Sequence, residues 1–135
     1  MNILIPYIWA AGGVHLLLVI GSVFLPSKLK YRASLSNASP IVRQIFLVHH
    51  VFIALVLLGF SGLCFFFAPE LSSANPLGKF LSGFIAIFWL LRIVVQTCYY
   101  DPDVKKQYPL ANVAYTLIFV YLASVFSLAT LGIVK

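Results

Sequence analysis

Four long apolar stretches, separated by prolines and turn residues, restrict the fold of this chain more than any other feature. They cover residues 6–25, 40–68, 76–100 and 109–134, and each holds 20 residues or more. A bilayer core about 30 Å thick is crossed by about 20 helical residues at 1.5 Å each. Each stretch is therefore long enough to cross a membrane as a helix.

The overall composition excludes a soluble domain. Hydrophobic residues make up 62% of the chain and charged residues 9%, whereas a soluble domain carries about 25% charged residues. Unpaired backbone groups in lipid cost several kcal/mol each, which favours helices over open strands. Short connections make consecutive helices antiparallel neighbours. We therefore predict an all-α integral membrane protein: one domain over residues 1–135, an antiparallel up-down bundle of four transmembrane helices.

Two of the stretches begin with a helix-start signal. Ser39 precedes Pro40, and Asn75 precedes Pro76. A serine or asparagine N-cap followed by a proline in the first turn is typical of a helix start. Prolines also mark expected ends, with Pro26 closing the first stretch.

Basic residues predict the orientation of the bundle. The side that holds connections 26–39 and 101–108, called side B, is rich in them. Its bases are Lys28, Lys30, Arg32, Lys105 and Lys106, with Arg43 at its edge. The opposite side, side A, holds both termini, connection 69–75 and the bases Lys79 and Lys135. The positive-inside rule then makes both side B loops cytoplasmic and both termini external, in a bacterial cytoplasmic (inner) membrane. So few bases between apolar spans indicate a lipid bilayer as partner, and no nucleic acid.

Ionisable residues inside the spans need an explanation, because they are expensive in lipid. Four stand out, namely His15, His49, His50 and Arg92. Counted from the side B ends of their spans, His15 and His50 both lie about 15 Å deep and Arg92 about 12 Å deep. His49 points about 100° away from His50 on the helix, so at most one of the two faces a given point. These depths predict one polar layer near the midplane.

This layer suggests three kinds of ligand. A b-type haem would be held by His15 and His50, with Gly12 allowing close approach of the porphyrin and arginines pairing with the propionates. A metal ion would use His15 and His50, without the acidic ligands that a closed zinc site needs. A quinone or lipid headgroup would use polar groups nearer side B. The candidate cofactor-binding residues are His15, His50, Arg92, Gln96, Tyr99, His49 and Arg43.

A purely structural role explains the same residues. A histidine in a membrane helix can bond to a carbonyl or hydroxyl group of a neighbouring helix. Arg92 can extend towards side B and meet Asp101 or Asp103. Small residues at 10–13, and Gly59 and Gly62, allow close helix approach inside the bundle or with a partner.

The leading functional hypothesis is a small integral membrane subunit or accessory protein of a larger, redox-linked complex, with other subunits or further copies of this chain as partners. Motifs of soluble enzymes are absent from the sequence, and no acidic residue lies within a span. A non-enzymatic role is therefore favoured. One alternative is a self-contained cofactor-binding protein for electron transport, holding haem b or quinone through His15 and His50. Another is a membrane enzyme that acts on a lipid-like substrate at the cytoplasmic interface, with His49 or His50 as base.

Overall fold

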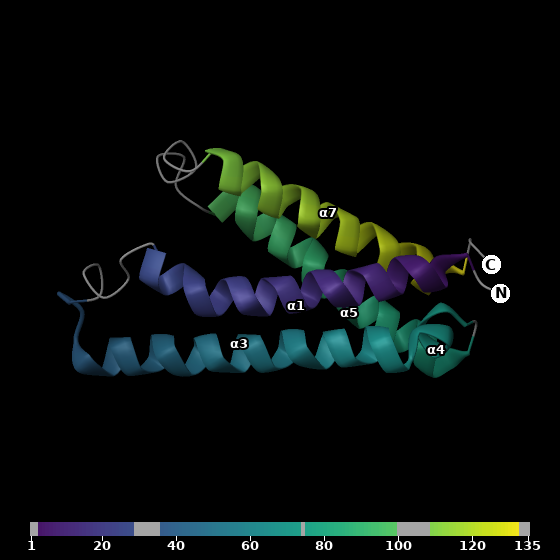
Figure 1. The fold of residues 1–135 in the computed structure, drawn as a ribbon, viewed down its shortest axis with the longest axis horizontal. Helices are drawn as coiled ribbons and strands as arrows, with labels where there is room; N and C mark the ends of the chain where they lie inside the picture. The colour runs from purple at the N-terminus through teal and green to yellow at the C-terminus, as the bar shows by residue number, and fades with distance from the viewer. Residues whose placement is uncertain (1–2, 29–35, 74, 100–108, 133–135) are drawn as a thin grey trace.

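The protein is a bundle of four long helices (Figure 1). The structure is a computed structural model, which describes residues 3–28, 36–73, 75–99 and 109–132. The elements are α1 (Leu4–Lys28), α3 (Pro40–Phe66), a short α4 (Ala68–Ser72), α5 (Pro76–Val94), a π-helical turn η1 (Val95–Tyr99) and α7 (Pro109–Leu131). Four segments, in α1, α3, α5 with η1, and α7, are long and apolar enough to cross a membrane. The predicted all-α integral membrane fold with four transmembrane helices is confirmed.

The helices are arranged as two antiparallel pairs. α1 packs mainly on α3, and α5 packs mainly on α7. The start of α1, the end of α7 and the short α4 lie together at side A (Figure 1). From there the two pairs diverge towards side B, where α3 reaches beyond the ends of α5 and α7 (Figure 1). The two pairs are therefore closest to each other at side A.

Helix α1 passes through the proline that was expected to end it. It begins at Leu4 and continues through Pro26 to Lys28. Proline has no backbone N–H, so the carbonyl four residues earlier, that of Ser22, loses its usual partner. Proline is tolerated within transmembrane helices where a neighbouring helix satisfies the freed group, and His50 of α3 supplies the donor here.

The second helix ends two residues before the expected residue 68, and a separate short helix follows it in the expected connection. α3 ends at Phe66, and α4 starts at Ala68 with Pro69 in its first turn. Leu71 of α4 is fully buried, and its carbonyl accepts a hydrogen bond from Ser82 Oγ of α5 at 2.8 Å. α4 thus closes the side A end of the bundle.

The start of α5 is fixed by its predicted cap. Asn75 Oδ1 accepts a hydrogen bond from the Gly78 N–H at 2.6 Å. A side chain on Gly78 would collide with the Glu70 carbonyl of α4, so α4 and α5 approach closely because residue 78 is glycine. Ser39, the other predicted cap, makes no side-chain capping bond to α3.

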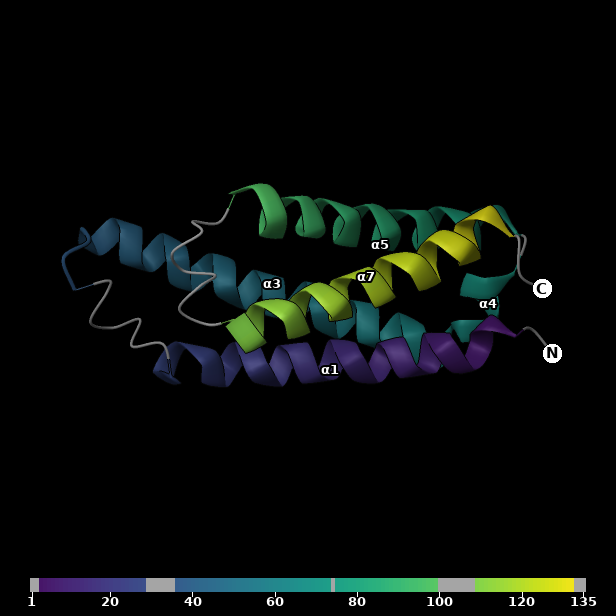
Figure 2. The same cartoon turned by 90° about the horizontal axis from the view of Figure 1, so that it is seen from above.

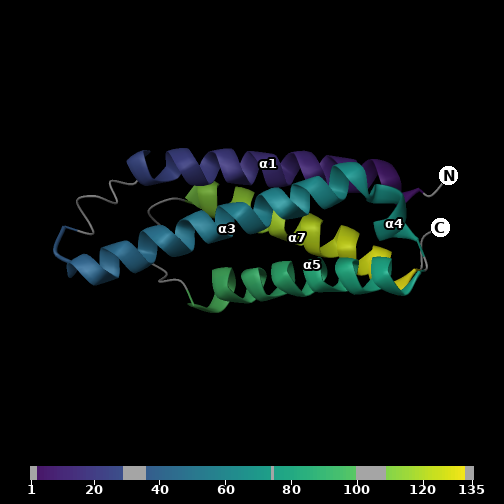
Figure 3. The same cartoon turned by 90° about the horizontal axis from the view of Figure 1, so that it is seen from below.

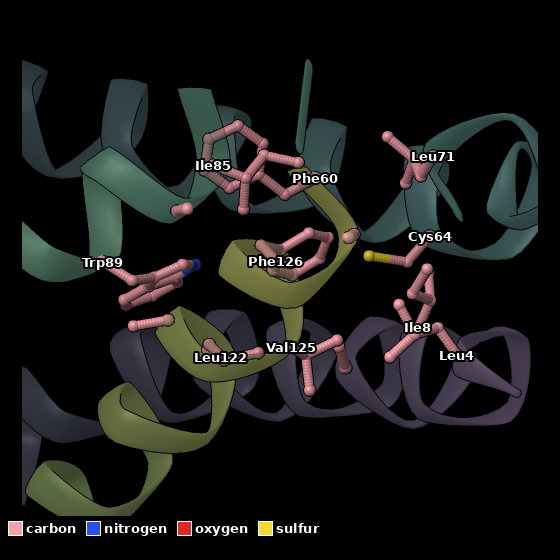
Figure 4. Close-up of a cluster of buried hydrophobic side chains, with 14 of the residues drawn as sticks. Leu4, Ile8, Phe60, Cys64, Leu71, Ile85, Trp89, Leu122, Val125 and Phe126 are labelled. Atoms are coloured by element: carbon pink, nitrogen blue, oxygen red, sulfur yellow. The ribbon is translucent and has the colours of Figure 1, made fainter. Parts of the chain in front are cut away.

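The core runs along the centre of the bundle from side A (Figure 4). Phe126 of α7 is fully buried in its middle, with Trp89 towards one end and Leu71 and Cys64 towards the other (Figure 4). Gly12 lies where α1 and α3 approach closely, since an added Cβ would be 3.0 Å from the Cβ of Cys64. Most outward side chains are apolar, as expected for helices surrounded by lipid.

Candidate functional site

His15 lies at the centre of the bundle and touches all three other long helices. Its side chain is 0% exposed. Its ring centroid is 5.7 Å from that of Phe60 in α3, 5.4 Å from Trp89 in α5 and 6.2 Å from Phe126 in α7. Trp89 in turn stacks on Phe119 of α7 at 5.2 Å. His15 is therefore the polar centre of an aromatic core.

Both ring nitrogens of His15 are already bonded within the protein. Trp89 Nε1–H can only donate, so His15 Nε2 accepts that hydrogen bond, at 3.2 Å. The proton of the neutral ring is then on Nδ1, which donates to the Ala11 carbonyl at 2.7 Å. Any metal or haem iron bound at Nε2 would have to displace Trp89. Within the described part of the chain, no three His, Cys, Asp or Glu side chains come together to hold a metal ion.

His50 bonds to the carbonyl that Pro26 leaves free. Its Nε2 lies 2.7 Å from the Ser22 carbonyl oxygen of α1. Ser22 is four residues before Pro26, so its carbonyl would otherwise lack a helical donor. Phe46, one turn earlier in α3, stacks on the imidazole with centroids 6.4 Å apart. His50 thus compensates for the proline in the neighbouring helix.

The prediction that His15 and His50 share one depth is wrong. His50 is level with Ser22, which is seven residues along α1 from His15, or about 10 Å. Equal depths require residues 25 and 40 to lie at the same membrane surface. α3 in fact starts farther out, with Pro40 ten residues beyond the His50 contact. The two imidazoles therefore do not face each other across a haem-sized gap at one level.

The space beside Gly12, which was expected to admit a porphyrin, is filled by side chains of α3. The Cβ position of Gly12 is filled by Cys64 and Phe65 of α3. Its carbonyl accepts a hydrogen bond from Ser61 Oγ at 3.0 Å. Gly12 therefore serves contact between α1 and α3.

His49 and Arg43 lie on the outer face of α3. Both side chains are exposed, and the only bond described for His49 is from Nδ1 to the Ile45 carbonyl of its own helix, at 2.9 Å. Of the adjacent histidines, His50 faces α1 and His49 faces away. The structure does not bring Arg43 together with His15.

The polar candidates of α5 lie against α7. Gln96 is 8% exposed and donates from Nε2 to Asn112 Oδ1 at 2.7 Å. The Arg92 guanidinium carbon lies 5.5 Å from the ring centroid of Phe119, a cation–π geometry. Tyr99 belongs to η1, and its side chain lies outside the described part of the structure, as do Asp101 and Asp103.

The predicted site residues are thus divided between separate places. His15 is at the bundle centre. His50 is level with Ser22, which lies about 10 Å nearer side B than His15 by helical rise along α1. Gln96 lies about 10 Å nearer side B than Trp89, the partner of His15, by helical rise along α5. The sequence alone does not identify Trp89 as the partner of His15, although its spacing of three residues puts it on the same side of α5 as Arg92. Nor does it identify the pairing of His50 with the carbonyl freed by Pro26.

Two glycines of α3 face open space. Gly59 is exposed and Gly62 half-buried, and a Cβ on either would have no neighbour within 4 Å. They lie three residues apart and therefore on one side of the helix. Unlike Gly12 and Gly78, they are not required by packing within the described chain.

Compared with protein-family models, with curated proteins and with solved structures, the chain gave no match.

Proposed function

We propose that this chain is a small subunit or accessory protein of a larger membrane assembly, and that a neighbouring transmembrane helix packs on α3 at Gly59 and Gly62. The observation that carries the proposal is the open space outside these two glycines. Glycine in a helix interior is about 1 kcal/mol less favourable than alanine. Contact with an outside helix explains this choice, because small residues let transmembrane helices approach closely.

The state of the core supports a structural rather than a cofactor-binding role. Both nitrogens of His15 and the Nε2 of His50 have protein partners. The Gly12 position that would admit a porphyrin is filled by α3. These contacts give no support to the redox-linked setting. A visible spectrum of the purified protein tests this: a Soret band that disappears in both His15→Ala and His50→Ala would support the haem alternative instead.

Larger side chains at the two glycines test the proposed contact. Gly59→Leu and Gly62→Leu should leave the fold intact, because no described atom lies within 4 Å of either Cβ. They should reduce the assembly that the wild-type chain forms in mild detergent, measured by native mass spectrometry. The matched control is Ala114→Leu, which adds the same side chain at an exposed position of α7. Assembly that survives both glycine variants, or falls equally in the control, would contradict the proposal.

We propose with this function that side B is cytoplasmic, in a bacterial cytoplasmic membrane. The support is the excess of bases on side B of the sequence. In a variant free of native cysteines, Asn37→Cys should react with a membrane-impermeant thiol reagent only after the cells are opened. Reaction in intact cells would reverse the orientation.

A further inference from the structure

The first turns of α3 extend past the rest of the bundle on side B. The His50–Ser22 hydrogen bond fixes the level of α3 against α1. Pro40 lies ten residues farther out, or about 15 Å by helical rise. Every residue from Pro40 to His49 is exposed. These turns therefore have no covering from the described part of the chain.

Their level in the membrane follows from α1. Ser22 is eighteen residues from Leu4 at side A, or about 27 Å by helical rise. This distance is close to the hydrocarbon thickness of about 30 Å. The part of α3 beyond His50 therefore lies in the headgroup layer of the side B leaflet and outside it.

Two bases occur at the same level in this layer. Arg43 is seven residues beyond His50 on α3, and Lys28 is six residues beyond Ser22 on α1. By helical rise they lie about 10 Å and about 9 Å past the contact between the two helices. The helices separate towards this end (Figures 2 and 3). No Asp or Glu occurs in residues 1–69 of the sequence, so neither helix carries an acid to neutralise them.

Apolar side chains accompany these bases. Leu47 is 66% exposed and Val51 is 52% exposed, and they lie four and eight residues deeper than Arg43 on the same side of α3. A cation at headgroup level beside exposed apolar groups is complementary to an anionic phospholipid, with its phosphate above and its acyl chains below.

We propose that this end of α3 binds an anionic phospholipid of the side B leaflet, with Arg43 holding the phosphate. The exposed apolar side chains of α3 contact the acyl chains. The binding is separate from the assembly contact at Gly59 and Gly62, which lies in the side A half of α3. Either proposal can therefore fail without the other.

Lipid retention in defined bilayers tests the proposal. The purified chain is reconstituted in nanodiscs with equal amounts of phosphatidylglycerol and phosphatidylcholine, and the lipids that it retains are identified by native mass spectrometry. The wild type should retain phosphatidylglycerol preferentially. One basic side chain near an anionic surface contributes about 1 kcal/mol, or about fivefold. Arg43→Gln should therefore lower the retained ratio about fivefold, and Arg43→Lys should keep it.

A base at the other end of the bundle supplies the matched control. Lys79 is exposed near the start of α5 on side A, so Lys79→Gln removes one charge without touching the proposed site. The ratio should stay at the wild-type value in this variant. An unchanged ratio in Arg43→Gln, an equal fall in Lys79→Gln or in Arg43→Lys, or a wild type without preference would each overturn the proposal.

Discussion

Replacing His50 with leucine removes the donor that bonds to the Ser22 carbonyl of α1 at 2.7 Å. That carbonyl has no helical N–H partner, because the residue four positions later is Pro26. In a Pro26→Ala background the new backbone N–H can bond to Ser22, so the loss of His50 should matter less. The two substitutions are therefore expected to be energetically coupled, although they lie on different helices.

The expected coupling follows from the groups involved. A buried carbonyl without a partner costs about 1–3 kcal/mol in proteins generally. Interhelical hydrogen bonds within membranes average about 0.6 kcal/mol and reach about 1.7 kcal/mol. Ser22 is half-buried near the edge of the hydrocarbon layer, so we expect the coupling energy to lie near the low end of the first range and within the second. His50→Leu should destabilise the wild type by about 1 kcal/mol more than it destabilises Pro26→Ala.

A double-mutant cycle measures this coupling. Unfolding of the wild type, both single variants and the double variant is followed by circular dichroism as the SDS fraction of mixed micelles rises. Independent substitutions add within about 0.3–0.5 kcal/mol. A coupling energy no larger than this deviation would refute the role assigned to His50.

The core and the side A closure give two further predictions. His15→Ala should lower the unfolding free energy by about 3 kcal/mol, because it opens a cavity and leaves the indole N–H of Trp89 without its acceptor. His49→Ala on the exposed face of α3 should stay within about 0.5 kcal/mol of wild type. Equal effects of the two substitutions in the same SDS titration would contradict the central position of His15. Gly78→Ala should cost about 1–3 kcal/mol, since its Cβ would meet the Glu70 carbonyl, and Gly59→Ala should be neutral or stabilising. Thermal melting in detergent distinguishes the two glycines, and an unchanged Gly78→Ala would refute the close approach of α4.

The fold could be predicted from sequence because the membrane leaves few choices. Four apolar stretches of sufficient length must be helical, and short connections make them antiparallel. Asn75 was correctly predicted to cap α5. The continuation of α1 past Pro26 could not be predicted from α1 alone. The compensating donor, His50, is 28 residues away in the sequence and acts through tertiary contact.

The candidate site was less predictable for a similar reason. Counting residues from the end of a stretch gives depth only if every helix ends at the same surface, and α3 does not. Helical periodicity puts Trp89 and Arg92 on one side of α5, but it contains no information on which neighbouring side chain meets His15. Whether a buried histidine is open to a ligand depends on such partners. Here the indole N–H of Trp89 donates to His15 Nε2, so this nitrogen is not open to a ligand.

The contact of α3 with another protein is tested most directly by photo-crosslinking in native membranes. A photoreactive phenylalanine derivative is placed at Phe66 in one variant and at Ala114 in another; Phe66 is 80% exposed and lies four residues after Gly62, on the same side of α3. Position 66 should give a discrete protein adduct of one mass, with a yield that falls when Gly62→Leu is added, and position 114 should give lipid adducts. Lipid adducts alone at both positions would contradict the proposal that this chain is a subunit of a larger membrane assembly through this face.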